Sequence, residues 1–572
     1  MNRVTIWLLV LSLAALVWFS HRLAGIRIYQ VDECENVCVA KILATGQQSN
    51  SYVFLSLLHF PLTWVSHGAA RAVDLLVAGR FLMLEIFWLN IVLIALATGQ
   101  KVLSSGGMAA LWGAATLAPL WDFGFEIRHD NLLLSGLLLF WCVARIRPNG
   151  IQSYVVCGVL ATALQFVAFK AFVYTVPMSL LTLVFPPTGQ TVPRWKLVLG
   201  YGAGALAFFI VMRLAYGASG LWDLFLSDFH RVAGDSAANH FAPWGTLARL
   251  LSQTPLLLAL IPAAILQVGL ELLRRKQALS WESDLPELCL FLIALGALLI
   301  NPTPFPYNLV NLVPFAYPLV FRYALRLWRE SSPKPILVPG FLAVLVFAHA
   351  VPFALATRRH LLWTNFRQER IIRFAEDLTD AKTDPVYDGI GMVPTRARVH
   401  YSWFLHSFNI EKFTKGPGPR VHEMLAARPA AVIIPSYRTD WLTDEDHDFI
   451  RQRYVALADD CWVLGSILPA GGGTFEVYHR GRYRISTLKG SDLADTYPVG
   501  LQGALMPEDP GTIQGTLDGI PLTNQPLELC EGTHRIECAS DCQPAVVWVG
   551  PHLDRVHRLG PGDHQQLFVN WY

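Results

Sequence analysis

The stretch VTIWLLVLSLAALVWFS, residues 4–20, contains no charged side chain and is followed by YQVDECENVC at residues 29–38. A long uncharged apolar run is typical of a membrane-spanning helix. The run lacks a small-residue cleavage site and further apolar runs follow it, so we expect a retained anchor rather than a cleaved secretory signal. Three carboxylates, Asp32, Glu33 and Glu35, therefore stand where the chain leaves the membrane.

The composition predicts a polytopic α-helical membrane protein. Of the 572 residues, 53% are hydrophobic and only 15% are charged, whereas soluble domains carry about 25% charged residues. The net charge of +2, without a basic stripe, gives no sign of a nucleic-acid partner. The shortage of charge is concentrated in residues 1–356, where apolar runs predict about eleven spans. They lie at residues 4–23, 80–99, 103–121, 131–146, 152–169, 171–186, 196–216, 249–272, 285–301, 307–326 and 335–356.

Lys and Arg gather in every second connection between these spans. Examples are ARIRPNG, with Arg145 and Arg147, and LLRRKQ, with Arg274, Arg275 and Lys276. Basic connections stay in the cytoplasm, so the tail that begins near residue 357 is expected outside it, in the periplasm of a bacterium whose inner membrane holds the chain. The remaining basic residues of these connections are Lys101, Arg194, Lys196, Arg326, Arg329 and Lys334.

The tail is expected to form two periplasmic domains. Residues 357–486 alternate helical and strand-like stretches, such as the buried strand PAAVIIPSY, and predict an α/β domain. Residues 487–572 are rich in Gly, Pro and short β-branched runs, which predicts a small β-sandwich. The tail cysteines Cys530, Cys538 and Cys542 are compatible with a disulfide outside the cytoplasm, whose pairing is open.

Several charged side chains fall on the non-cytoplasmic side of the predicted spans. WDFGFEIRHDN, residues 121–131, carries Glu126, Arg128, His129 and Asp130. Ionisable groups at membrane depth are costly and usually face a cavity or a partner. Simpler readings remain, because any one carboxylate is usually solvated surface and a lone cation can be a snorkelling anchor. The scattered histidines His129, His230 and His240 show no metal-ligand spacing, and metal dependence, including a divalent cation, stays open.

The order of the motifs resembles the GT-C superfamily of lipid-phosphosugar glycosyltransferases over about residues 1–480. IYQVDECENVCVAKILATGQ is similar to the family's first outer loop, where an acidic pair starts a helix, and two surface helices precede the second span. FEIRHDNLLLSGLLLF resembles its E-x-R-P-D-x-L-L signature, with His129 in place of Pro. ALQFVAFKAFVYTVP resembles its Lys-containing segment, and PTPFPYNLVNLVPFAYPLV its late span, without the usual His before Tyr307. Within the superfamily, these motifs resemble the bacterial aminoarabinose-transferase, RgtA/B/C/D-like and protein O-mannosyltransferase-like branches.

The resemblance implies a GT-C-like fold and transfer of a sugar, with inversion, from a polyprenyl-phosphate donor to a hydroxyl of a lipid, glycan or protein acceptor. A carboxylate would take the acceptor proton as general base; Asp32 is the first candidate and Glu33 the second. Positive side chains would neutralise the phosphate that leaves. Candidates for that role are Arg128, Lys170 and Arg231.

Three further residues are expected to support this site. Asp130 and Glu126 would orient Arg128 rather than react. Tyr307 belongs to an aromatic group with Phe305 and Trp244 that would guide the lipid or stack on a sugar, although an interfacial aromatic belt is the favoured explanation.

Two other classes of protein compete with the enzyme. A lipid or glycan transporter, such as a flippase, usually has internal repeats and charges near the midplane, and the sequence contains no 20–50-residue repeat. A scaffold with a glycan-binding β-domain would be insensitive to replacement of Asp32 or Arg128.

Overall fold

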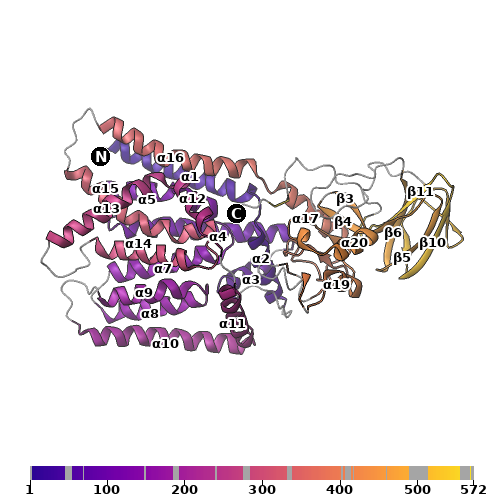
Figure 1. The fold of residues 1–572 in the computed structure, drawn as a ribbon, viewed down its shortest axis with the longest axis horizontal. Helices are drawn as coiled ribbons and strands as arrows, with labels where there is room; N and C mark the ends of the chain where they lie inside the picture. Colours follow the sequence, from indigo (N-terminus) through magenta and orange to yellow (C-terminus); the bar gives the residue numbers. More distant parts are fainter. Residues whose placement is uncertain are drawn as a thin grey trace.

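The computed structural model consists of a bundle of long helices joined at one end to a mixed α/β tail (Figure 1). It describes residues 3–45, 55–68, 70–146, 150–184, 192–238, 241–274, 284–330, 338–400, 404–405, 414–416, 418–458, 460–488, 513–553 and 567–568. Four basic residues used to predict the orientation, Arg147, Arg275, Lys276 and Lys334, lie outside the described residues, as does His240.

The bundle is built from helices that run roughly alongside one another (Figure 1). Among the described residues, four helices are long and apolar enough to cross a membrane, at Ile6–Ile26, Ala72–Ala97, Arg194–Ala218 and Pro255–Leu273. These four coincide with predicted spans and indicate a multi-pass membrane protein, but the total of about eleven spans is not confirmed. The helices are α1 (Arg3–Ile26), α2 (Val31–Ala44), α3 (His59–Gly68), α4 (Ala72–Ala97), α5 (Ser105–Ala115), α6 (Ala118–Phe123), α7 (His129–Ile146), α8 (Ile151–Gln165), α9 (Ala171–Val184), α10 (Arg194–Ala218), α11 (Trp222–Ala238), α12 (Trp244–Gln253), α13 (Pro255–Arg274), α14 (Leu285–Ile300), α15 (Val313–Glu330) and α16 (Val338–Leu362), with a 3-10 helix η1 (Pro306–Asn311).

Two predicted spans are broken in the structure. The span at 103–121 is divided into α5 and α6, with Pro119 in the first turn of α6. The span at 249–272 is divided into α12 and α13 at Thr254, directly before Pro255. Proline lacks a backbone donor and disfavours a helical conformation at the preceding residue. The apolar pattern continues across both breaks, which is why it did not reveal them.

The segment between α1 and α4 forms two short helices, α2 and α3, as expected before the second long helix. Gln30 caps α2 in a capping box with Glu33. Asp32 and Glu33 lie in its first turn, where negative charge interacts favourably with the helix dipole. The chain in front of α3 is fastened to the end of α8, because the backbone N–H of Leu57 donates to the Phe166 carbonyl at 2.8 Å.

The described part of the tail contains three α-helices, the 3-10 helix η3 (Thr439–Trp441) and two sheets. The larger sheet has the order β1-β2-β4-β11-β6-β9, with β3 paired to β4, and the smaller one β5-β10-β7-β8. The elements are α17 (Phe366–Leu378), α19 (Val421–Ala427), α20 (Asp444–Arg453), β1 (Val386–Tyr387), β2 (Val432–Ile433), β3 (Tyr454–Ala458), β4 (Cys461–Ile467), β5 (Gly472–Val477), β6 (Gly481–Leu488), β7 (Gly515–Leu517), β8 (Ile520–Pro521), β9 (Leu527–Leu529), β10 (Gly532–Cys538) and β11 (Gln543–Trp548).

The predicted boundary between the domains at 357–486 and 487–572 is wrong. It falls inside β6, and β11 lies between β4 and β6 in one sheet. Strands from both sides of the boundary also share the smaller sheet, where β10 pairs with β5. Such pairing joins segments far apart in sequence, so a shift in local composition did not reveal it. All nine cysteines are free thiols.

Candidate active site

Asp32 and Arg128 form an ion pair where α2 meets the segment in front of α7. The Asp32 side chain is 33% exposed, whereas Arg128 is buried. The Arg128 guanidinium lies over the ring of Tyr307, with its Cζ atom 3.6 Å from the ring centroid. A cation stacked on an aromatic face is held in one orientation and keeps its charge. The structure therefore presents the carboxylate of Asp32 to solvent beside a fixed positive charge.

Asp130 and Lys170 extend this pair into a row of alternating charges. The Arg128 Nε atom lies 3.3 Å from an Asp130 carboxylate oxygen, and Lys170 forms an ion pair with the other oxygen. Lys170 also donates to the Asn308 side-chain oxygen at 2.6 Å. Four segments of the chain, around residues 32, 130, 170 and 308, thus meet at one place. Two cations there share one buried carboxylate.

Glu33 occupies a different environment from its neighbour Asp32. Its carboxylate is fully buried and accepts from Arg80 Nε at 2.8 Å and Arg80 Nη2 at 2.6 Å. It also accepts from the backbone N–H groups of Gln30 at 2.8 Å and Ile127 at 3.2 Å. These four donors occupy both oxygens. Glu33 therefore holds the start of α2 against the residue that precedes Arg128.

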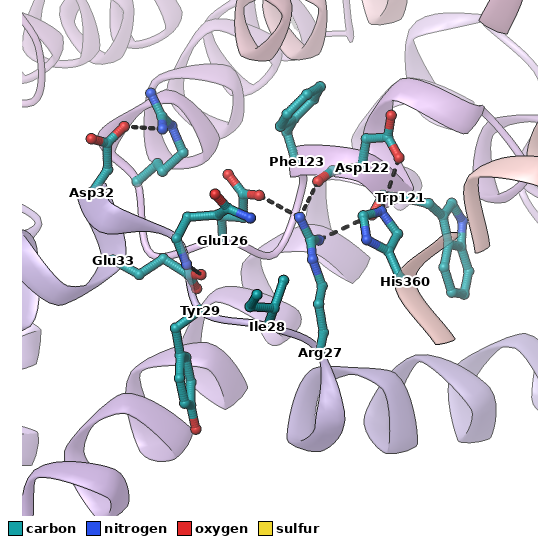
Figure 2. A network of polar contacts seen from close by, with 12 residues as sticks. Arg27, Ile28, Tyr29, Asp32, Glu33, Trp121, Asp122, Phe123, Glu126 and His360 are labelled. Carbon is teal, nitrogen blue, oxygen red and sulfur yellow. Dashed lines mark hydrogen bonds and ion pairs between the residues drawn. The ribbon is translucent and has the colours of Figure 1, made fainter. Parts of the chain in front are cut away.

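Glu126, predicted to orient Arg128, forms an ion pair with Arg27 instead. Figure 2 shows the Arg27 side chain reaching from the end of α1 between Glu126 and Asp122. Arg27 donates to the backbone carbonyl of Asp122 at 2.5 Å. Of the two carboxylates predicted to orient Arg128, only Asp130 contacts it. Glu126 and Arg27 instead hold the backbone of the segment that carries Arg128.

The Asp122 carboxylate joins three helices behind the site. It accepts from Arg249 at 3.1 Å and from Gln253, both of α12, and from Arg359 at 2.5 Å and His360 at 2.9 Å, both of α16. Figure 2 shows His360 directed at this carboxylate. The helix that leads into the tail is thereby fastened to the segment that bears the site.

Glu35 and Arg231 lie near this row of charges. Glu35 follows Asp32 by about one helical turn and is 7% exposed. Burial, together with the negative charge of Asp32, raises the pKa of Glu35 well above its ordinary value, and Arg438 of the tail and Arg231 act against this shift. Arg231 is paired with Asp228 at 2.7 Å. The predicted third cation is thus close enough to act on the site electrostatically, through Glu35.

The described part of the chain holds no group of three or more His, Cys, Asp or Glu side chains placed to bind a metal ion.

Three positioning residues were not singled out from the sequence: Arg27, Arg80 and Asn308. Arg80 is the only basic residue of its predicted span at 80–99, and an arginine in an apolar helix usually faces a partner. The sequence therefore contained a signal for the positioning role of Arg80. Asn308 stands in NPTPFPYN, beside Tyr307, but an asparagine in a proline-rich turn has no distinctive pattern.

No protein-family model and no curated protein matches the sequence. Its fold is similar to solved structures of the oligosaccharyltransferase of Archaeoglobus fulgidus. The apo form gives a TM-score of 0.48 at 12% identity, covering 77% of this chain and 73% of that one. The form tethered with an acceptor peptide gives 0.46 at 11% identity over 81% and 72%. A complex with an inhibitory peptide and a dolichol-phosphate gives 0.46 at 12% identity over 78% and 71%.

Proposed function

We propose that this chain is a membrane glycosyltransferase that moves a sugar from a polyprenyl-phosphate donor to an acceptor hydroxyl. The observation that carries the proposal is the row formed by Asp32, Arg128, Asp130 and Lys170. It sets a partly exposed carboxylate in a row with two cations, which is the arrangement needed for a base on one side of a bond and a phosphate on the other.

The reaction would be one displacement at the anomeric carbon. The acceptor oxygen forms the new C–O bond while its proton passes to the Asp32 carboxylate, a general-base step typically worth about 10²–10⁴-fold. The bond between the anomeric carbon and the phosphate oxygen breaks, and its electron pair leaves with the phosphate. Arg128 and Lys170 neutralise that charge, and fixed cations of this kind stabilise a transition state strongly. Attack from the side opposite the phosphate inverts the configuration.

The contacts favour Asp32 over Glu33 as the base. Glu33 is buried and accepts four hydrogen bonds, so it has no oxygen to offer an acceptor. Asp32 is partly exposed and contacts the proposed phosphate ligand Arg128 directly. Arg231 is a third cation for the donor, and Tyr307 acts by supporting Arg128.

The location and partners of the chain follow from this proposal. We place the site at the non-cytoplasmic face of a bacterial inner membrane, with the tail on the same, periplasmic side. The acceptor is a lipid, a glycan or a protein, and the branch of the GT-C superfamily stays a prediction.

Proteoliposomes with a polyprenyl-phosphate sugar labelled in the sugar test the proposal against a flippase. We expect the label to move from the lipid to a water-soluble or lipid acceptor supplied from a membrane extract, and Asp32→Asn to stop this transfer. Movement of the intact labelled lipid between leaflets, without transfer and without sensitivity to Asp32→Asn, would contradict the proposal.

A further inference from the structure

The side chain of His129 is more exposed than that of any member of the charged row. Its side chain is 39% exposed, compared with 33% for Asp32, 20% for Lys170, 4% for Arg128 and 1% for Asp130. Its Nε2 atom lies 3.8 Å from a carboxylate oxygen of Asp130, which is longer than a hydrogen bond. The imidazole therefore lies beside Asp130 with more than a third of its side chain accessible.

Desolvation is the main reason why the ring of His129 is neutral. Partial desolvation of the imidazole, with the cations Lys170 and Arg128 nearby, lowers the pKa of His129 to about 4, although Asp130 and Asp32 act in the opposite direction. A neutral imidazole offers one N–H donor and one nitrogen acceptor. That pair of groups suits a hydroxyl, which both donates and accepts, better than it suits a phosphate, which needs donors.

The position of His129 selects one part of the donor. Under the proposed function the phosphate lies against Arg128 and Lys170, which both contact Asp130, and the imidazole of His129 lies 3.8 Å from the same carboxylate. Only the sugar and the lipid chain are bonded to that phosphate. Because the lipid chain has no hydrogen-bonding group, the sugar is the part of the donor that an imidazole beside the phosphate can bind.

We propose that His129 is a specificity-determining residue that binds a hydroxyl of the transferred sugar. The inference rests on the proposed function for the place of the phosphate. It assigns a role to His129, the one position at which the signature around Arg128 differs from that of the GT-C superfamily, where proline is usual.

The difference between His129 and the proline of the family signature also suggests a suitable variant. His129 is the first residue of α7, and proline is favoured at the first position of a helix because the N–H there has no intrahelical partner and the φ angle is already suitable. His129→Pro should therefore remove the imidazole and leave the helix intact. His129→Gln keeps one donor and one acceptor on a side chain of different shape.

The test is a binding measurement in detergent micelles by isothermal titration calorimetry. The probes are a polyprenyl phosphate and the same lipid carrying a hexose, a hexosamine or a pentose. We expect wild type to bind one of the sugar lipids more tightly than the bare lipid. His129→Pro should weaken that sugar lipid about 5-fold, the size of one net hydrogen bond, and leave the bare lipid unchanged. His129→Gln should recover part of the loss.

Three results would overturn the inference: unchanged affinity of His129→Pro for the sugar lipid, an equal loss for the sugar lipid and the bare lipid, or no preference of wild type for any sugar. Failure of the proposed function would look different. Wild type would then bind the sugar lipids but transfer no sugar, whatever residue 129 is.

Discussion

The carboxylate of Asp32 and the guanidinium of Arg128 are paired although 96 positions separate them in the sequence. The pair links the base and the phosphate ligand of the proposed reaction. When Asp32 takes a proton it loses its negative charge, and its attraction for Arg128 falls at the moment when the leaving phosphate gains charge. The positive charge of Arg128 is then directed to the phosphate, which makes proton transfer and departure of the lipid mutually supporting.

Replacement of Arg128 should reduce transfer according to how much of the guanidinium is lost. Arg128→Gln removes the charge and is expected to lower kcat/KM about 10²–10³-fold, as for loss of one fixed donor to a developing anion. Arg128→Lys keeps the charge but loses the planar fork and the stacking on Tyr307, so its loss should be smaller. Initial rates over a range of donor concentrations provide the measurement. Arg535→Lys, exposed on β10, is the matched control, and an equal effect of the three changes would contradict the role of Arg128.

Glu33→Gln should destabilise the fold more than Asp32→Asn. Removal of one partner of a buried ion pair typically costs about 3–5 kcal/mol, because the other charge stays buried without compensation, and Arg80 is 1% exposed. Asp32 is partly exposed, so water can replace part of its interaction with Arg128. Thermal unfolding of both variants in detergent gives the comparison. A lower Tm for Asp32→Asn than for Glu33→Gln would mean that the two carboxylates have been assigned the wrong roles.

The sequence was informative about the site because its motifs fall in separate loops on one side of the predicted spans. The structure brings Asp32, Arg128, Asp130 and Lys170 into contact, whereas Arg231 is paired with Asp228. The different roles of Asp32 and Glu33 could not be predicted from the sequence. Adjacent carboxylates are equivalent in a sequence, and their roles separate only when Arg80 of α4 is seen beside one of them.

The fold was predictable where it depends on local pattern and unpredictable where it depends on distant pairing. The long apolar helices α1, α4, α10 and α13 were recognised from their composition. The helix breaks before α6 and α13 each depend on a single proline. One proline hardly changes the mean hydropathy of a long apolar stretch, so the breaks were not predicted. The insertion of β11 between β4 and β6 has no local signal at all.

Glu35→Gln should change stability in a pH-dependent way. Burial and the charge of Asp32 raise the pKa of Glu35 in the folded state. A carboxyl with a raised pKa contributes stability at low pH, and this is lost as the pH rises above the unfolded pKa toward the folded one. The isosteric amide does not titrate, so the Tm of the variant relative to wild type should be higher at about pH 8 than at about pH 5. An identical difference at both pH values would show that Glu35 titrates normally.

Truncation of the chain after residue 486 should unfold the tail rather than remove one domain. It deletes β11, whose residues Val546 and Trp548 are buried between β4 and β6, and leaves two strand edges unpaired. We expect rapid proteolysis of residues 357–486 in the truncated protein, measured against the full chain. Co-expression of residues 487–572 as a separate polypeptide should restore part of the protection. A protease-resistant tail in the truncated protein alone would mean that the predicted boundary at residue 486 is correct after all.

The most direct test of the account is the transfer rate of Asp32→Asn measured together with its affinity for the donor lipid. The amide keeps the size of the side chain but cannot take a proton. We predict a fall in the single-turnover transfer rate of about 10²-fold or more, with donor affinity retained, and a partial recovery in Asp32→Glu. Transfer at the wild-type rate by a correctly folded Asp32→Asn would contradict the account.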